Sequence, residues 1–186
     1  MRNLGKVYET KRLLLKGLEA DDAELVLDYL VRNKNFLEVW ENSREFDYYT
    51  IEAQEKLLLK DFIENENENL LRLWIFKKED DRKIIGSVGF SNIVKGSFLS
   101  CHLGYKLDGN EINQGLVTEA IRKGIDIIFN EFKLHRIEAN IMPKNLRSLR
   151  VVEKLGFYNE GLAYKYLKIN GKWEDHIHMV LLNDEV

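Results

Sequence analysis

The chain of 186 residues predicts an α/β (α+β) fold, in which helices flank a mixed sheet of about six to seven strands. Two observations support this prediction. Segments whose apolar residues recur with a helical period alternate with shorter segments whose apolar residues recur at every second position. The elements follow in the order strand, two helices, three strands, helix, strand, helix and two strands, so strands can be parallel only where a helix connects them. No repeat or linker interrupts this order, and we expect residues 1–186 to form a single domain.

The first half of the chain predicts one strand, two helices and two further strands. Their expected ranges are 12–18 for the first strand, 21–30 and 51–63 for the helices, and 70–76 and 84–90 for the next strands. Asp21 or Asp22 can cap the first helix and Thr50 the second, because their side-chain oxygens can accept hydrogen bonds from the free N–H groups of a helix start. The alternating acidic and amide residues 64–69 predict a solvated loop or a frayed helix end, and a charged turn is expected at 77–83.

The second half predicts the rest of the sheet and two more helices. The expected ranges are strand 98–107, helix 118–132, strand 135–142, helix 145–155 and strands 157–169 and 173–182. Gly156 follows the shorter helix at the position where glycine is favoured. The pair Asn170-Gly171 is a strong signal for a two-residue hairpin turn between the last two strands.

The composition indicates a soluble globular protein, with 45% hydrophobic and 32% charged residues and a net charge of −3. The acidic balance argues weakly against nucleic acid as a partner. The single cysteine, Cys101, excludes a disulfide within the chain and is typical of a reducing compartment. No apolar run approaches the ~20 residues needed to cross a bilayer, and the first twelve residues lack the apolar core of a signal peptide. We therefore expect a cytoplasmic protein with neither a nucleic-acid nor a membrane partner.

The most informative segment follows the strand at 98–107. This strand ends in a polar turn that contains Gly109, Asn110, Asn113 and Gly115 and leads directly into an amphipathic helix. The first N–H groups of a helix have no partner within it, and the helix dipole is positive at this end, so the turn predicts a site for a phosphate or pyrophosphate. The alternative is that the glycine only marks the helix start. The segment matches neither a Walker loop nor a dinucleotide-binding fingerprint.

A set of motifs in a fixed order makes the interpretation more specific. In chain order they are Tyr105-Lys106-Leu107, Gly115 to Ala120, Leu134 to Ala139, Asn145 to Ser148, Glu153 to Phe157, Glu160-Gly161 and Trp173-Glu174-Asp175. Over about residues 10–182, this set resembles the GNAT acetyltransferase superfamily. Within it, the sequence is similar to the RimJ/RimL-type branch, which is named for ribosomal-protein N-terminal acetyltransferases.

The resemblance implies a GNAT fold whose sheet is splayed between the strands at 98–107 and 135–142, with acetyl-CoA as co-substrate in the gap and no metal. It implies that an amine attacks the thioester directly in a ternary complex and that main-chain groups bind the carrier. The implied cofactor-binding residues are Lys106, Leu107, Ile112, Asn113, Gln114, Gly115, Leu116, Val117, Thr118, Asn145 and Ser148.

The loop departs from the family pattern at three of these positions. Ile112 replaces the usual Gln or Arg, Val117 replaces a small residue, and Asn113 stands where a further glycine is common. In the family, the pyrophosphate contacts come mainly from main-chain N–H groups, which a change of side chain leaves in place. We therefore expect acetyl-CoA binding to survive these departures.

Ser148 is the first candidate for the catalytic donor to the departing CoA thiolate, on the basis of the resemblance. From spacing alone, Asn145 is an N-cap and Ser148 a surface serine near a helix start. Tyr158, Tyr164 and Tyr166 are alternative donors, although strand packing also explains them.

The catalytic base is less well defined. Some ribosomal-protein members carry a glutamate at the position that best matches Leu167, and His102 is the next candidate, on the strand that leads to the acetyl site. Glu160, Asp175 and His176 are weaker candidates, and Glu138 is expected to be a cross-strand partner.

Two other groups of side chains have a structural and a functional interpretation. Arg147, Arg150 and Lys154 recur on one helix stripe, which is either a solvated face or a partner for the 3′-phosphate of CoA. His176 and His178 share a strand face, but no third ligand at a clear spacing supports a metal site.

The expected activity is transfer of an acetyl group from acetyl-CoA to a primary amine, with a protein or peptide N-terminus as the leading acceptor. The alternatives are a small-molecule acetyltransferase for a polyamine, an amino acid or an aminoglycoside, and a non-catalytic acyl-CoA-binding module. The aromatic residues Phe36, Trp40 and Trp74 are expected to help shape the acceptor site or to lie in the core. The expected state is a monomer or homodimer.

Overall fold

A computed structural model describes residues 6–186. Residues 1–5, which belong to the segment in which no signal peptide is expected, lie outside the described residues. In chain order the strands and α-helices are β1 (Val7–Glu9), β2 (Leu13–Lys16), α1 (Ala23–Leu37), α2 (Ile51–Glu66), β3 (Leu71–Lys77), β4 (Asp80–Val94), β5 (Ser100–Leu107), α3 (Leu116–Asn130), β6 (Arg136–Ile141), α4 (Leu146–Glu153), β7 (Tyr158–Ile169) and β8 (Lys172–Leu182). Two short 3-10 helices, Ala20–Asp22 and Phe46–Tyr49, precede α1 and α2.

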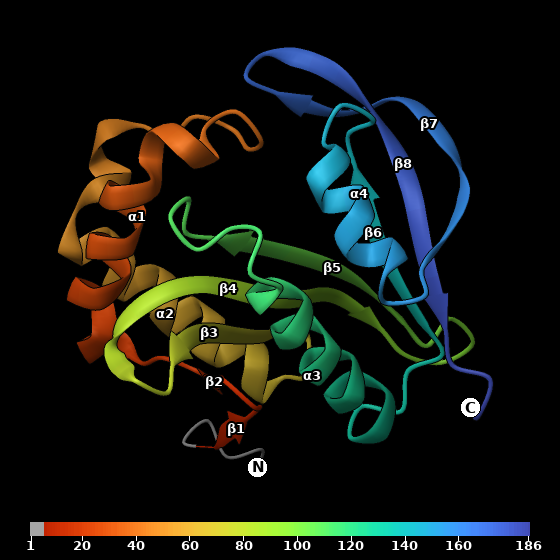
Figure 1. The fold of residues 1–186 in the computed structure, drawn as a ribbon, viewed down its shortest axis with the longest axis horizontal. Coiled ribbons are helices and arrows are strands. Elements are labelled where there is room, and N and C mark those ends of the chain that lie inside the picture. The colour runs from red at the N-terminus through yellow and green to blue at the C-terminus, as the bar shows by residue number, and fades with distance from the viewer. Residues whose placement is uncertain (1–5) are drawn as a thin grey trace.

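The strands form one mixed sheet in the order β1-β2-β3-β4-β5-β6-β8-β7 (Figure 1). Neighbouring strands are antiparallel except β5 and β6, which α3 connects. These two strands pair over only three positions, the last of which joins His102 to Glu138. Beyond that pair they separate, as Figure 1 shows. The predicted splay between the two strands is therefore confirmed.

The helices cover the two faces of the sheet with separate apolar clusters. Alternate residues of β3 join different clusters: Leu73 and Ile75 pack in the cluster that includes α3, whereas Trp74 and Phe76 pack in the cluster that includes α1 and α2. Because side chains alternate along a strand, α3 and the α1–α2 pair lie on opposite faces. The apolar stripe expected on α3 is buried in the first cluster.

The sequence predicted about six to seven strands, whereas eight strands pair among residues 6–186. The missed strand is β1, which forms a hairpin with β2. It has only three residues, too few to give an alternating pattern.

Two predicted element ends were also wrong. Helix α1 continues seven residues past its expected end at Leu30, because Leu37 is buried and the amide of Asn33 donates to the Tyr29 carbonyl at 2.9 Å. The charged turn expected at 77–83 is shorter, since Lys77 already pairs with Asp80 in a hairpin.

Two turn and cap predictions were confirmed. The Thr50 hydroxyl accepts a hydrogen bond from the main-chain N–H of Ala53 at 3.2 Å, as expected for an N-cap. Asn170 and Gly171 have φ angles of 47° and 80° and connect β7 to β8. Positive φ at both central residues is what a two-residue hairpin of this kind requires.

Candidate active site

The start of α3 provides unpaired main-chain donors. Gly115 is the N-cap of α3 and has a φ of 75°, and Asn113 has a φ of 63°. A left-handed conformation at both positions turns the chain sharply from the loop into the helix. The N–H groups of the first turn of α3 then have no helical partner and face the same region as the positive end of the helix dipole.

This helix start lines a cleft of about 360 Å³ between α1, β5, α3 and α4. Ten of the eleven residues predicted to bind the cofactor line it: Lys106, Leu107, Ile112, Asn113, Gly115, Leu116, Val117, Thr118, Asn145 and Ser148. Gln114 does not, because its side-chain amide donates to Glu111 at 3.1 Å. Arg147, Arg150 and Lys154 also line the cleft, so three cationic residues border it.

A set of contacts that the sequence did not reveal fixes the start of α3 to the turn between β1 and β2. The carboxylate of Glu119, in the first turn of α3, accepts hydrogen bonds from the Thr10 hydroxyl at 2.7 Å and from the Arg12 main chain at 2.8 Å. It also pairs with the Arg12 guanidinium at 2.7 Å, which donates to the Gln114 carbonyl at 3.0 Å. Burial raises the pKa of Glu119, but these donors outweigh it and hold the pKa below its ordinary value.

A second set fixes the loop between β5 and α3 to α1. Asp108 is buried and pairs with Arg32, and its carboxylate accepts from the main-chain N–H of Asn110 at 2.9 Å. Asn33 accepts from the N–H of Gly109 at 3.0 Å. Burial raises the pKa of Asp108, but the hydrogen bonds and the charge of Arg32 together have the larger effect and bring the pKa below its ordinary value. The carboxylate therefore stays ionised. The position of Asp108, directly after an apolar strand and before a glycine, is the signal that sequence reasoning passed over.

Tyr105 and Ser148 meet inside the cleft. Their hydroxyl oxygens are 2.6 Å apart, so either hydroxyl can donate to the other, and the Ser148 carbonyl, 3.0 Å from the Tyr105 oxygen, is a second acceptor for the phenol proton. Burial raises the pKa of Tyr105 to about 12, so this phenol keeps its proton at neutral pH. The side chain of Asn145 accepts from the Ser148 N–H at 3.2 Å, which confirms that Asn145 is an N-cap. The pair can therefore supply one proton to a group in the cleft.

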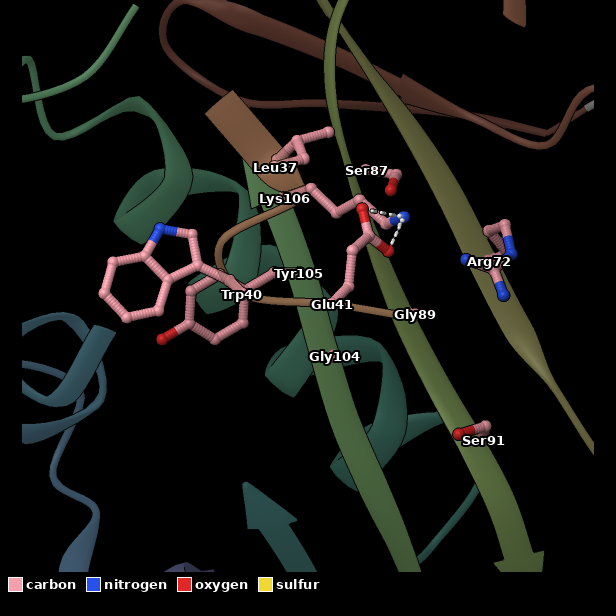
Figure 2. Close-up of a pocket in the computed structure, with 10 residues that line it drawn as sticks. All are labelled: Leu37, Trp40, Glu41, Arg72, Ser87, Gly89, Ser91, Gly104, Tyr105 and Lys106. Atoms are coloured by element: carbon pink, nitrogen blue, oxygen red, sulfur yellow. Dashed lines mark hydrogen bonds and ion pairs between the residues drawn. The ribbon is translucent and has the colours of Figure 1, made fainter. Parts of the chain in front are cut away.

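A second pocket, of about 270 Å³, lies on the other face of β5 (Figure 2). Its floor is formed by alternate residues of β4 and β5, and Gly89 pairs with Gly104 in the middle of it. Figure 2 shows Lys106 and Glu41 in contact, with Nζ 2.7 Å and 3.1 Å from the two carboxylate oxygens. Leu37, Trp40, Tyr105 and Lys106 line both cavities, so the pocket and the cleft meet there.

The aromatic residues expected near the acceptor lie in different places. Phe36 lines the cleft, and Trp40 lines both the cleft and the second pocket. Trp74 is buried in the cluster beneath α1 and α2 and lines a third cavity. Trp40 is therefore the one of the three that lies where the two cavities meet.

The predicted base candidates lie outside the cleft. His102 is on β5 beside the last β5–β6 pair; its Nδ1 is 3.2 Å from the Asn92 amide and its Nε2 is 3.8 Å from Glu138. Leu167 is 44% exposed on β7. Glu160 is paired with Arg136, and Asp175 accepts from the main-chain N–H of residue 165. None of these four lines the cleft or the second pocket.

Within residues 6–186, no group of three or more His, Cys, Asp or Glu side chains is placed to hold a metal ion. In the same part of the chain, no helix is both long and apolar enough to cross a membrane.

Comparison with known proteins gives the same family at several levels. The model for the acetyltransferase (GNAT) domain matches residues 12–158. The probable N-acetyltransferase YjcK of Bacillus subtilis (strain 168) is 42% identical over 175 residues, which cover 94% of this chain and 96% of the relative. The [ribosomal protein uS5]-alanine N-acetyltransferase of Escherichia coli (strain K12) is 36% identical over 178 residues, covering 94% and 90%. The ribosomal-protein-S5-alanine acetyltransferase structure from Vibrio fischeri has a TM-score of 0.91 at 34% identity and covers 97% of this chain and 98% of that one.

A sheet that opens between two parallel strands, with free main-chain donors at the opening, forms a site suited to a phosphorylated ligand. The chain belongs to the GNAT acetyltransferase family, in agreement with the ordered motifs, and resembles its RimJ/RimL-type members. It is an acetyl-CoA-dependent N-acyltransferase.

Proposed function

We propose that this enzyme acetylates the α-amino group of a protein or peptide N-terminus. The observation that carries the proposal is the meeting of two cavities at Tyr105 and Lys106. The cleft on one side has the donors for a phosphorylated carrier, and the pocket on the other has the space for an acceptor. An acceptor that enters from the pocket reaches a thioester held in the cleft without a covalent enzyme intermediate.

The floor of the pocket supports a peptide acceptor. Gly89 and Gly104 pair across β4 and β5. The space above Gly104 is open, whereas the Arg72 guanidinium lies 3.5 Å from the position that a Cβ of Gly89 would occupy. A peptide can therefore approach the sheet closely at Gly104. The 36% identity to the uS5-alanine N-acetyltransferase of Escherichia coli, whose name specifies an alanine of a ribosomal protein, supports the same acceptor class.

The residues of the cleft have defined roles in this proposal. Main-chain N–H groups from 113 to 118 bind the pyrophosphate, and Arg147, Arg150 and Lys154 are partners for the 3′-phosphate. Backbone groups near Lys106 and Leu107 bond the pantetheine arm. Because main-chain donors carry the pyrophosphate contact, Ile112 and Val117 leave it in place.

The departing sulfur is the other half of the chemistry. When the amine nitrogen bonds to the acetyl carbon, the carbon–sulfur bond breaks and leaves a thiolate. The Ser148 hydroxyl donates a proton to that thiolate, and Tyr105, 2.6 Å away, replaces it. The phenol can do this because it is still protonated at neutral pH.

The proposal is tested with acetyl-CoA and three acceptors: a peptide with a free N-terminal alanine, the same peptide with a blocked N-terminus and one lysine, and spermidine. Mass spectrometry locates the added acetyl group and thiol release gives the rate. The proposal predicts acetylation of the free α-amine, whose ordinary pKa of ~7.7–8.0 leaves part of it neutral. Turnover confined to spermidine or lysine would contradict it and favour a small-molecule or side-chain acceptor.

A further inference from the structure

A group of polar side chains lies on the sheet beside the point where β5 and β6 separate. Glu138 belongs to the last pair that joins the two strands, and Asn140 is the next residue of β6 on the same face. His178 of β8 pairs directly with Asn140. These side chains share the sheet face of His102 and Lys106, on which the second pocket also lies, although none of the three lines that pocket.

Glu138 is held firmly as a carboxylate. Arg136 donates to it at 2.8 Å and also pairs with Glu160. The Glu138 side chain is only 14% exposed. Burial raises its pKa, but the hydrogen bond from Arg136 and the other donors outweigh burial and bring the pKa below its ordinary value. Such a carboxylate is a poor proton acceptor but a stable partner for a cation.

His178 has one nitrogen on this carboxylate and the other unpaired. Its Nδ1 is 3.4 Å from Glu138, which favours the tautomer with the proton on Nδ1. Its Nε2 then has a free lone pair, and this atom is buried without a hydrogen-bond partner in the described chain. The Oδ1 of Asn140, on the paired residue, is also buried and unpartnered there.

Two unpaired polar atoms on directly opposed residues need an explanation, because each buried group without a partner costs about 1–3 kcal/mol. A donor placed between Asn140 and His178 would satisfy both. An amine has the required chemistry, since one of its hydrogens can go to Asn140 and another to the imidazole nitrogen. His102 is the weaker candidate because Asn92 faces its Nδ1 and Glu138 faces its Nε2.

We propose that His178 accepts the proton of the acceptor amine, that Asn140 orients this amine, and that Glu138 is the positioning residue for the imidazole. This inference rests on the proposed function. The bound ammonium transfers one proton to Nε2, which makes the imidazole a cation next to Glu138. The nitrogen lone pair then attacks the thioester carbon and the carbon–sulfur bond breaks. Ser148 gives its proton to the thiolate, Tyr105 replaces that proton, and the second proton of the nitrogen restores the Tyr105 phenol. The imidazolium returns its proton to solvent.

Several titratable or charged groups surround the imidazole and belong to its pH dependence. They are Glu138 and Arg136 on β6, Tyr166 and Glu160 on β7, His176 on β8, and His102 on β5 through the shared carboxylate. The Tyr166 ring lies 4.8 Å from that of His178, edge to face, and its hydroxyl is 3.4 Å from the Asn140 amide. Two carboxylates, Glu138 and Glu160, therefore lie near the imidazole, and Arg136 pairs with both of them.

The test compares His178→Gln and Glu138→Gln with a matched control, His176→Gln. His176 lies on the same strand and near the same Tyr166 ring, but its Nδ1 is 3.1 Å from the Glu174 carbonyl. The kcat/KM for an alanine peptide is measured from pH 6 to 9.5, with calorimetry of acetyl-CoA binding. We expect His178→Gln to lose about 100-fold at pH 6.5, with the loss shrinking above the amine pKa of ~8, where free amine no longer needs a base.

Glu138→Gln gives a second test, which remains valid even if the His178→Gln protein does not fold. Loss of the carboxylate removes the partner of the His178 Nδ1 and leaves the ring orientation and tautomer unfixed, so we expect kcat/KM to fall at pH 6.5 while the affinity for acetyl-CoA is kept. The control is expected to keep both. A wild-type profile in His178→Gln, or a loss that is equal at every pH, would overturn the inference. Failure of the wild type to acetylate the peptide would instead overturn the proposed function; the variants are compared on whichever amine is acetylated.

Discussion

The contact between Tyr105 and Ser148 predicts a specific pattern of rate losses. Their oxygens are 2.6 Å apart, and the tyrosine pKa of about 12 leaves its proton available. A hydrogen bond to a charged group contributes about 1.5–3 kcal/mol, and 1.4 kcal/mol corresponds to tenfold in rate. Ser148→Ala and Tyr105→Phe should therefore each lower kcat about 10- to 100-fold, with little change in the KM for acetyl-CoA.

The double variant distinguishes one relay from two separate donors. If the two hydroxyls act in sequence, Ser148→Ala with Tyr105→Phe loses no more than the worse single variant, because either change breaks the relay. The assay is thiol release under saturating acetyl-CoA and peptide. Tyr158→Phe is the control, since this exposed tyrosine contacts Glu160 outside the cleft. Losses that multiply, or a kcat that Ser148→Ala leaves unchanged, would refute the relay.

Three further predictions concern the start and packing of α3. Gly115→Ala places a side chain at a φ of 75°, which costs about 1–2 kcal/mol, and should weaken acetyl-CoA binding about tenfold by calorimetry. The control is Gly96→Ala, at a φ of 72° in the turn between β4 and β5, which lines neither cavity and should lose stability but not affinity. Glu119→Gln removes a carboxylate with a lowered pKa, whose stabilisation is present at neutral pH and is lost as pH falls through that pKa; urea unfolding should show a loss of about 2 kcal/mol at pH 7 that diminishes below about pH 4.5. Gly124→Ala puts a Cβ 2.5 Å from the buried Phe90 ring, and should lower the Tm by roughly 3–6 °C.

Local patterns predicted most of the fold because each depends on neighbouring residues alone. The apolar stripe of α3 and the Asn170-Gly171 turn are of this kind, and both were confirmed. Helix α1 was predicted too short because its last turns are largely polar, and their burial depends on contacts with the loop after β5. Strand β1 is too short to have a pattern of its own.

The candidate site, too, was only partly predictable from the sequence. The loop around Gly115 could be found because its turn residues are contiguous in sequence. The contact between Arg12 and Glu119 joins residues 107 positions apart and leaves no local signal. The same is true of Glu138 and His178, which the pairing of β6 with β8 brings together, and for this reason the sequence indicated only a cross-strand partner at Glu138.

The central claim is that main-chain donors at the start of α3 hold the pyrophosphate of acetyl-CoA in the cleft. A crystal structure of the enzyme with acetyl-CoA tests it most directly. The account predicts phosphate oxygens at about 2.7–3.2 Å from main-chain nitrogens between residues 113 and 118, and the sulfur beside Ser148. Density for the carrier at any other place on the protein would contradict it.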